Sequence, residues 1–283
     1  MGRGRYNSRW RRLVEHIGAS VFRERWAARL AYDLRLQGKL VVDRRHFALP
    51  LARVLEVPLR VAFASDFHAG PLTDRRLLRR AFEAIAGFEP HLLLLGGDYI
   101  SMHHRHIETL AAHLRATAAP LGMFAVFGNH DLWVDDSFIA QALVAAGVRP
   151  LVNESVRLPA PFDEVVVCGL DEPGTGAPDP VGTLGGVEGV RLLLMHSPHG
   201  LQLVAEHAFH IAFCGHTHGG QIALPGRRPL VLPRGAGPRR YARGGHFRLA
   251  RGELLVSNGV GMSELPIRLF APSEVHLCTL QAG

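Results

Sequence analysis

Histidine and acidic residues stand at the ends of several apolar runs in this chain. The stretch HIAFCGHTHGGQI, residues 210–222, ends a hydrophobic run with His216 and His218 on either side of one threonine. Imidazole and carboxylate groups are common protein ligands of first-row transition metals. Because a pair of histidines at this spacing can arise by chance, the ends of the other apolar runs decide whether the pair belongs to a site.

Four other apolar runs end in the same kind of residue. Their terminal residues are Asp66 and His68 after 59–65, Asp98 after 91–97, Asn129, His130 and Asp131 after 122–128, and His196 at the end of 190–196. Ligand sites in open α/β sheets lie at the carboxyl ends of strands, so residues far apart in sequence meet there. Glycines beside them allow tight turns and close approach of the backbone. The pattern therefore predicts one composite site.

The candidate ligands comprise two carboxylates, one amide and four imidazoles. They are Asp66, Asp98, Asn129, His68, His196, His216 and His218. Seven ligands exceed what one ion with an open position takes, and they suit two ions that share a bridging carboxylate. Mixed ligation of this kind favours Mn, Fe or Zn, whereas Mg prefers oxygen. Solvent that bridges two such ions is acidified to hydroxide near neutral pH, and this hydroxide is the predicted nucleophile.

The charge of such a centre favours an anionic substrate. Two divalent ions, two aspartates and one hydroxide leave a net charge of about +1. A positive site in a low-dielectric cleft attracts an anion and stabilises the negative charge that develops on phosphoryl oxygens during in-line displacement. Phosphate esters are therefore the predicted substrates. The charge of the site does not exclude a neutral amide or ester as substrate, but such a substrate would gain less from the positive charge.

Apolar runs and the segments between them predict the elements that position these residues. Six short runs are expected to be strands buried on both faces: 59–65, 91–97, 122–128, 164–170, 190–196 and 209–215. Helical patterns lie between several of them, at 74–87, 107–117 and 138–146. The alternation predicts an α/β domain in which helices cover a central sheet.

The N-terminal segment carries the positive charge of the chain. The 283 residues have a formal net charge of +7, to which residues 1–45 contribute +8 and residues 46–283 about −1. Apolar residues recur there at helical spacing, namely Trp10, Leu13, Val14, Ile17 and Val21, followed by Trp26, Leu30 and Leu34. We therefore expect a basic amphipathic helical segment at 1–50, followed by a catalytic domain at 51–283. The helical stripe either packs on that domain or, in a second interpretation, contacts an anionic membrane surface through residues 1–45.

Composition excludes several classes of protein. No apolar run reaches the ~20 residues of a membrane-spanning helix, and three cysteines are too few and too scattered for a disulfide framework. The pair Arg11-Arg12 is not followed by the continuous apolar stretch of an export signal. We expect a cytoplasmic protein, peripheral on the inner face of the membrane under the second interpretation above. The near-neutral charge of residues 46–283 argues against a nucleic-acid partner.

The complete set of motifs resembles the calcineurin-like metallophosphoesterases. That family has D-x-H, G-D, G-N-H-[DE], a lone His and G-H-x-H in this order, and residues 59–283 contain all five. The resemblance implies an α/β fold in which two mixed β-sheets pack as a sandwich flanked by helices. It also implies one metal held by Asp66, His68, Asp98 and His218, and a second held by Asp98, Asn129, His196 and His216.

The same resemblance implies roles for two neighbouring residues. His130 is expected to contact the phosphoryl group and to protonate the leaving oxygen. Asp131 is expected to orient His130 as a hydrogen-bond acceptor.

A narrower resemblance, to the bacterial YkuE/YaeI-type branch of the family, is carried by GHTHGGQI (215–222), RRYARG (239–244) and residues 257–275. Some relatives cleave the pyrophosphate of UDP-diacylglucosamine in lipid A synthesis, and others sit at membranes or the cell wall. The resemblance implies a small or lipid-linked phosphodiester or pyrophosphate substrate. Members often carry an N-terminal export signal or anchor, which the basic segment replaces here. Ser263-Glu264 departs from the small residues expected before the Pro-x-Arg element, so a phosphate contact by Arg268 stays open.

Two further functions are compatible with the motifs. A nuclease or a cyclic-nucleotide phosphodiesterase would use the same chemistry, and the near-neutral charge of residues 46–283 counts against the nuclease. A non-catalytic scaffold would keep the fold for protein binding, but scaffolds usually lose ligands that this chain retains.

Two groups of residues have open roles. His103, His104 and His106 follow the Asp98 loop, and Arg227, Arg228, Arg239, Arg240 and Arg243 lie in a Pro/Gly-rich region. Each group either lines a substrate pocket or belongs to a solvated loop.

Overall fold

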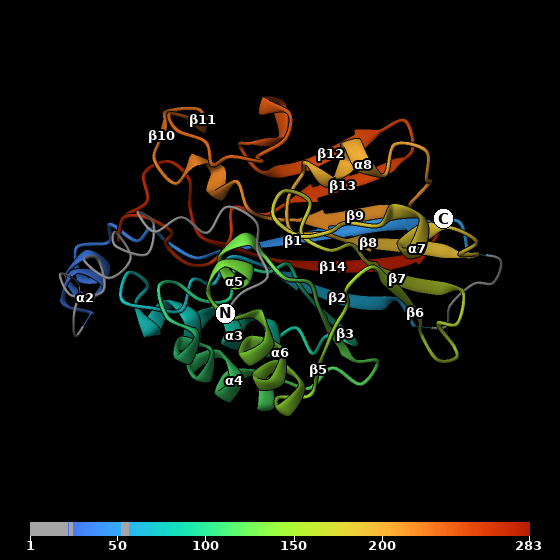
Figure 1. The fold of residues 1–283 in the computed structure, drawn as a ribbon, viewed down its shortest axis with the longest axis horizontal. Helices are drawn as coiled ribbons and strands as arrows, with labels where there is room; N and C mark the ends of the chain where they lie inside the picture. Colours follow the sequence, from blue (N-terminus) through green and yellow to red (C-terminus); the bar gives the residue numbers. More distant parts are fainter. Residues whose placement is uncertain (1–21, 23–24, 52–56) are drawn as a thin grey trace.

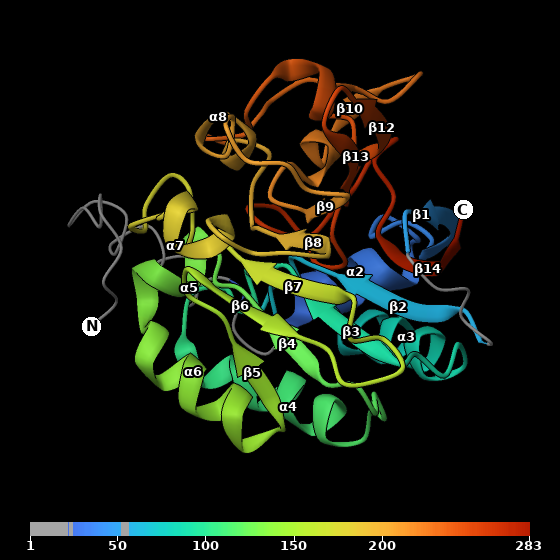
Figure 2. The same ribbon diagram turned by 90° about the vertical axis from the view of Figure 1, so that its right-hand side faces the viewer.

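Two six-stranded mixed sheets packed face to face form the centre of the protein in the computed structural model, which describes residues 22, 25–51 and 57–283 (Figure 1). Helices flank the sandwich, as Figure 2 shows for α3, α4 and α6 beside the first sheet. The expected fold class is therefore confirmed. The predicted helical stripe at 10–21 lies outside the described residues.

The first sheet contains three of the predicted strands. Its order is β1 (Val41–Leu49), β14 (Glu274–Ala282), β2 (Leu59–Ala64), β3 (Leu92–Leu95), β4 (Met123–Ala125) and β5 (Val148–Pro150). Strands β2 to β5 run parallel to one another, and β14 is antiparallel to β2. The carboxyl ends of β2, β3 and β4 therefore open at one edge of this sheet.

The second sheet contains the other three predicted strands. Its order is β12 (Gly245–Leu249), β13 (Gly252–Val256), β9 (Ile211–Cys214), β8 (Val190–Leu194), β7 (Val165–Gly169) and β6 (Glu154–Arg157). The four central strands are parallel, and the two edge strands are antiparallel to their neighbours. The sheet thus presents the ends of β8 and β9 side by side.

Burial on both faces explains why the strands read as continuous apolar runs. In β2, Val61 and Phe63 face the core between the two sheets, whereas Ala62 and Ala64 face the helices. The helices that cover this outer face are α3 (Arg75–Ala86), α4 (Ile107–Arg115) and α6 (Asp136–Ala145). A third core cluster lies on the outer face of the second sheet, beside α7 (Pro180–Leu184) and α8 (Gly200–Leu203).

Short elements lie close to the strand ends. They are the helix α5 (Asn129–Val134), the 3-10 turns η2 (His104–His106), η3 (His218–Gly220) and η4 (Arg239–Tyr241), and the two-residue strands β10 (Ala223–Leu224) and β11 (Arg228–Pro229). Helix α5 begins directly after the third predicted strand, so its first residues are placed at the sheet edge.

The N-terminal segment contributes a helix and a strand. Helix α2 (Trp26–Asp33) buries Ala27, Ala28 and Ala31, whereas Leu30 on the predicted stripe is exposed. The predicted helical segment extends to residue 50, but residues 41–49 form β1 and pair in parallel with β14. Two β-branched valines and the alternation of buried Phe47 and Leu49 favour a strand there. Among the described residues, no helix has the length and hydrophobicity needed to cross a bilayer.

Candidate metal centre

The ends of five strands bring the predicted ligands together. Three overlapping groups have their ligand atoms within 4.8 Å of one another: Asp66 with His68 and His218, His68 with Asp98 and His130, and Asp98 with His196 and His216. The last predicted ligand, Asn129, places Oδ1 3.1 Å from His196 Nε2. The structure therefore gathers all seven predicted ligands and His130 in one place.

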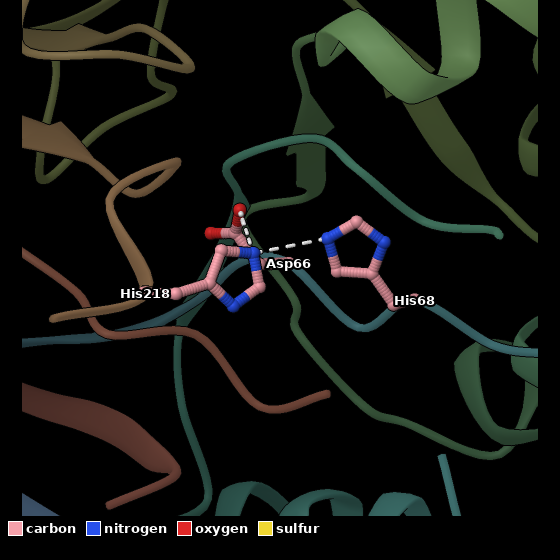
Figure 3. A group of neighbouring side chains, drawn as sticks. All are labelled: Asp66, His68 and His218. Carbon is pink, nitrogen blue, oxygen red and sulfur yellow. Dashed lines mark hydrogen bonds and ion pairs between the residues drawn. The ribbon is translucent and has the colours of Figure 1, made fainter. Parts of the chain in front are cut away.

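The first half of the centre is built by Asp66, His68 and His218 (Figure 3). His68 Nε2 and His218 Nε2 face each other at 3.0 Å, and Asp66 Oδ1 lies 3.4 Å from His218 Nε2. Ligand atoms bound at ~2.1 Å to one tetrahedral or octahedral ion lie roughly 3.0–3.4 Å apart. The spacing of these three side chains fits that requirement.

The second half contains His196, His216 and Asn129. His196 Nε2 lies 3.0 Å from His216 Nδ1 and 3.1 Å from Asn129 Oδ1. Asp98 Oδ2 lies 3.5 Å from His196 Nε2 and also 3.5 Å from His68 Nε2 in the first half. One carboxylate oxygen therefore stands between the two halves.

Hydrogen bonds behind the rings fix the tautomers of two histidines. His196 Nδ1 lies 2.7 Å from the carbonyl oxygen of Gly96, and His216 Nε2 lies 2.7 Å from that of Arg234. Because a carbonyl oxygen only accepts, both ring nitrogens donate, and the facing nitrogens of the neutral rings carry lone pairs. Two lone pairs that meet at 3.0 Å repel unless a cation or a proton lies between them. The donor set therefore fits a bound metal ion.

The electrostatics of the site also favour cations. Burial opposes ionisation of Asp66 and Asp98, but the neighbouring imidazoles outweigh it and keep the pKa of both carboxyls below the ordinary value. Burial likewise opposes protonation of His196, yet Asp98 and Asp66 raise the pKa of His196 to about 10. Two buried carboxylates thus create a negative potential where a cation is stabilised.

Five of the seven ligands have left-handed backbone conformations. The φ angles are 52° for Asp66, 41° for His68, 53° for Asp98, 69° for His216 and 52° for His218. Non-glycine residues in this region cost about 1–3 kcal/mol when they are held away from ordinary conformations, and such residues cluster at functional sites. Hydrogen bonds between the loops compensate, since Asp66 N donates to Gly97 O and His68 N donates to Asp98 O. The loops are therefore held in a shape that turns the side chains inward.

Two glycines are required by close contacts with the carboxylates. A Cβ atom on Gly215 would overlap Ser65 Oγ and Asp66 Oδ2, and one on Gly128 would overlap Asp98 Oδ1. This explains why glycine precedes both the His216 and the Asn129 motifs.

His130 lies on the open side of the centre. Its backbone N–H donates to Asp98 Oδ1 at 2.8 Å, and its ring packs edge-on against His68 at 4.7 Å and Trp133 at 5.0 Å between centroids. The side chain is half-buried, whereas the histidine ligands are buried. His130 is therefore placed to meet a substrate that approaches from solvent.

Asp131 is buried and surrounded by backbone N–H groups. Its carboxylate accepts hydrogen bonds from the backbone N–H groups of Gly128, Asp98 and Tyr99 at 2.8–2.9 Å. Burial, with the charge of Asp98, raises the pKa of Asp131 to about 8. Asp131 therefore clamps the loop of Asp98 to the start of α5, and its expected role in orienting His130 stays a prediction.

Arg268 is buried behind His218 and does not face the substrate side. Its guanidinium donates to the carbonyls of Gly261 at 2.6 Å, Asn258 at 2.8 Å and His218 at 3.2 Å. Nη2 also lies 3.1 Å from His218 Nδ1. In this conformation the structure thus rules out a phosphate contact by Arg268. Its side chain instead supports the ligand His218, a contact that the spacing of the motifs did not predict.

The two groups of residues with open roles have different surroundings. Ser101, which the motifs did not identify, has Oγ 2.9 Å from His68 Nδ1, and the turn η2 with His104 and His106 follows it. Arg228, Arg239 and Arg240 are exposed, so their guanidinium groups remain available to solvent.

Comparison with known proteins agrees with this geometry. Residues 59–250 match the model of the calcineurin-like phosphoesterase superfamily domain. The chain is 27% identical over 224 residues to the uncharacterized metallophosphoesterase YkuE of Bacillus subtilis. The matched region covers 77% of this chain and 77% of that one. It is 28% identical over 236 residues to an uncharacterized metallophosphoesterase of Aquifex aeolicus, covering 79% of this chain and 85% of that one.

A third relative has a more specific name. The chain is 29% identical over 177 residues to phosphodiesterase YaeI of Escherichia coli, covering 59% of this chain and 63% of the relative. The match to the family model spans more than half of the chain and contains the whole ligand set. The chain therefore belongs to the calcineurin-like phosphoesterase superfamily and is a metallophosphoesterase, a hydrolase of phosphate esters.

Proposed function

We propose that the protein cleaves a phosphodiester or pyrophosphate bond in a small or lipid-linked substrate, with two divalent ions of Mn, Fe or Zn in the centre. The observation that carries the proposal is the position of Asp98 Oδ2, 3.5 Å from both His68 Nε2 and His196 Nε2. A carboxylate oxygen shared in this way is what two adjacent ions require.

The proposed ligand sets follow the two halves of the centre. One ion would be held by Asp66, His68, Asp98 and His218, and the other by Asp98, Asn129, His196 and His216. When bound, two such ions supply Lewis acidity, which lowers the pKa of coordinated water and neutralises charge on phosphoryl oxygens.

The remaining chemistry is assigned to side chains of the chain itself. His130 lies beside the centre on its open side and, as a protonated imidazole, would donate a proton to the leaving oxygen. Its position depends on the hydrogen bond from its own N–H to Asp98 Oδ1. Asp131 would maintain this arrangement through the backbone of Asp98.

The choice of a diester or pyrophosphate has a separate basis. The Escherichia coli relative is named a phosphodiesterase. Residues 219–252 contain eight arginines and no acidic residue, and this segment reaches the centre where His216 Nε2 donates to Arg234 O. Exposed arginines near the centre suit a substrate with more than one anionic group. A cytoplasmic location is a further prediction.

A substrate panel tests this proposal. The purified, Mn-loaded protein would be assayed with a p-nitrophenyl monoester, a bis-p-nitrophenyl diester and a nucleotide-sugar pyrophosphate, with Asp98→Ala as the inactive control. We expect the diester or the pyrophosphate to be cleaved with the higher kcat/KM, and the control to cleave neither. Preference for the monoester would contradict the proposed substrate class.

A further inference from the structure

Exposed apolar side chains occupy three segments that are linked to one another by backbone hydrogen bonds. We call these residues the apolar rim: Leu30 and Leu34 at α2, Leu230 and Val231 after β11, and Leu269 and Phe270 in the loop before β14. Val231 is 73% exposed and Phe270 is 58% exposed. Large side chains with this exposure on neighbouring segments are typical of interaction surfaces.

Hydrogen bonds join the three segments into one surface. Arg268 N donates to Leu36 O at 2.6 Å, which ties the loop before β14 to the turn after α2. Ala223 N donates to Leu269 O at 2.9 Å, and Leu230 N donates to Ile222 O at 3.2 Å. Figure 1 shows α2 and the β10-β11 hairpin in the left half of the view, with α2 well below the hairpin.

The apolar rim is attached to the ligands of the centre. Arg268, next to Leu269, donates to the carbonyl oxygen of His218 at 3.2 Å. Arg234, three residues after Val231, accepts the hydrogen bond from His216 Nε2 at 2.7 Å. The segment that follows Val231 therefore connects the apolar rim to a ligand of the centre through Arg234, which is exposed.

Charge around the apolar rim has one dominant sign. Residues 219–252 contain eight arginines and no Asp or Glu, and Arg228 and Arg234 beside Leu230 and Val231 are exposed. Arg29, Arg35 and Lys39 are exposed on the α2 side, where Asp33 is paired with Arg76 at 2.8 Å. Protein surfaces that bind anionic lipid bilayers typically combine apolar side chains such as leucine, valine and phenylalanine with cationic side chains.

A second copy of the chain is a poorer occupant. In a two-fold symmetric dimer through this surface, arginines would approach arginines, and such like-charge contacts oppose association.

We propose that the apolar rim docks on the surface of an anionic lipid bilayer and presents the metal centre to the headgroup layer. The inference extends the proposed function, because a lipid-linked ester would be reached from this surface. It assigns membrane contact to three described segments that include the β10-β11 region and the loop before β14.

Vesicle binding tests the proposal with the full-length, metal-loaded protein. Co-sedimentation would be measured with phosphatidylcholine vesicles that contain or lack phosphatidylglycerol. Leu230→Ser/Val231→Ser is expected to lower partition onto the anionic vesicles by about tenfold or more, because both side chains would insert at the interface. The matched control is Val144→Ser/Val181→Ser, at residues 61% and 67% exposed on α6 and α7, and it should bind like wild type.

Hydrolysis of a soluble diester separates docking from catalysis. Both double variants are expected to keep wild-type turnover of this substrate, which also shows that they fold. Wild-type protein that fails to bind anionic vesicles, or a rim variant that binds as well as the control variant, would overturn the docking proposal. If the wild type and the control variant are dimers but the rim variant is a monomer, the occupant of the apolar rim is a second copy of the chain. This result would also overturn the docking proposal. Failure of the wild type to cleave any diester or pyrophosphate would instead contradict the proposed function.

Discussion

At the scale of single residues, the ligand types and their order could be predicted from sequence, but some contacts could not. The motifs gave Asp66, His68, Asp98, Asn129, His196, His216 and His218, and the structure brings these residues together. The environment of Asp131 depends on backbone N–H groups of residues 98, 99 and 128, and that of Arg268 on five separate carbonyls. Backbone partners of this kind leave no pattern in side-chain spacing.

His130→Ala tests the proposed proton donor. Loss of a positioned general acid typically lowers turnover by about 10²–10⁴-fold, and we expect a kcat decrease in this range with a soluble diester. Metal content should stay unchanged, because His130 belongs to neither of the two proposed ligand sets, although its ring lies close to them. Steady-state kinetics with elemental analysis of the same sample would check both results. Turnover close to wild type would show that His130 does not have this role.

Asp131→Asn tests the clamp on the Asp98 loop. The carboxylate accepts three backbone N–H groups, and an amide would turn its NH₂ group toward at least one of these donors. A buried donor without an acceptor costs about 1–3 kcal/mol, so we expect lower thermal stability and weaker metal binding. Calorimetry and metal titration would measure these effects. Unchanged metal affinity would mean that the clamp does not hold the bridging carboxylate in place.

At the scale of elements, β2, β3, β4, β7, β8 and β9 were predicted by their apolar runs, whereas the edge strands and the neighbouring β13 and β14 were not. Strands β5 and β6 are short and partly exposed, and β12 lies at a sheet edge, so their sequences lack a continuous apolar run. The helical prediction for residues 1–50 is wrong at β1, whose Asp43, Arg44 and Arg45 continue the charged composition of the segment before it. Its pairing with β14 joins opposite ends of the chain, and no local pattern encodes that contact.

The pairing of β1 with β14 is predicted to depend on pH through His276. This buried histidine lies 3.0 Å from Asp43 and 3.3 Å from Glu274, which in turn face Arg45 and Arg227. Burial lowers the pKa of His276, but the hydrogen bond to Asp43 and the ion pair with Glu274 outweigh it and raise the pKa to about 9. The contribution of protonated His276 to the stability of the fold is therefore fully present below the unfolded pKa of roughly 6.5. This contribution is lost as pH rises through about 9.

His276→Gln measures this contribution. Hydrogen bonds that involve a charged group contribute about 1.5–3 kcal/mol, so the variant should lose a free energy of unfolding in this range at pH 6. The difference from wild type should shrink above pH 9, where the histidine is neutral. Urea denaturation at the two pH values would test it, and a difference that does not change with pH would contradict the assignment.

At the scale of the whole molecule, two sheets from different parts of the chain share one centre. The first sheet contributes Asp66, His68, Asp98 and Asn129 through the ends of β2, β3 and β4, and the second contributes His196, His216 and His218 through β8 and β9. Each half of the centre contains residues from both sheets, so packing of the sandwich and formation of the site are coupled. The sequence predicted that the strand ends converge, but the division of strands between the sheets came from the structure.

Metal stoichiometry measured together with activity tests the central claim most directly. Purified wild-type protein should hold two transition-metal ions per chain and lose hydrolysis of a soluble diester when a chelator removes them. Asp98→Ala, which removes the oxygen between the two halves, should lower occupancy of both sites and abolish turnover while the chain remains folded by circular dichroism. A wild-type protein that binds fewer than two ions at full activity, or an Asp98→Ala protein that keeps both ions and its turnover, would contradict the account.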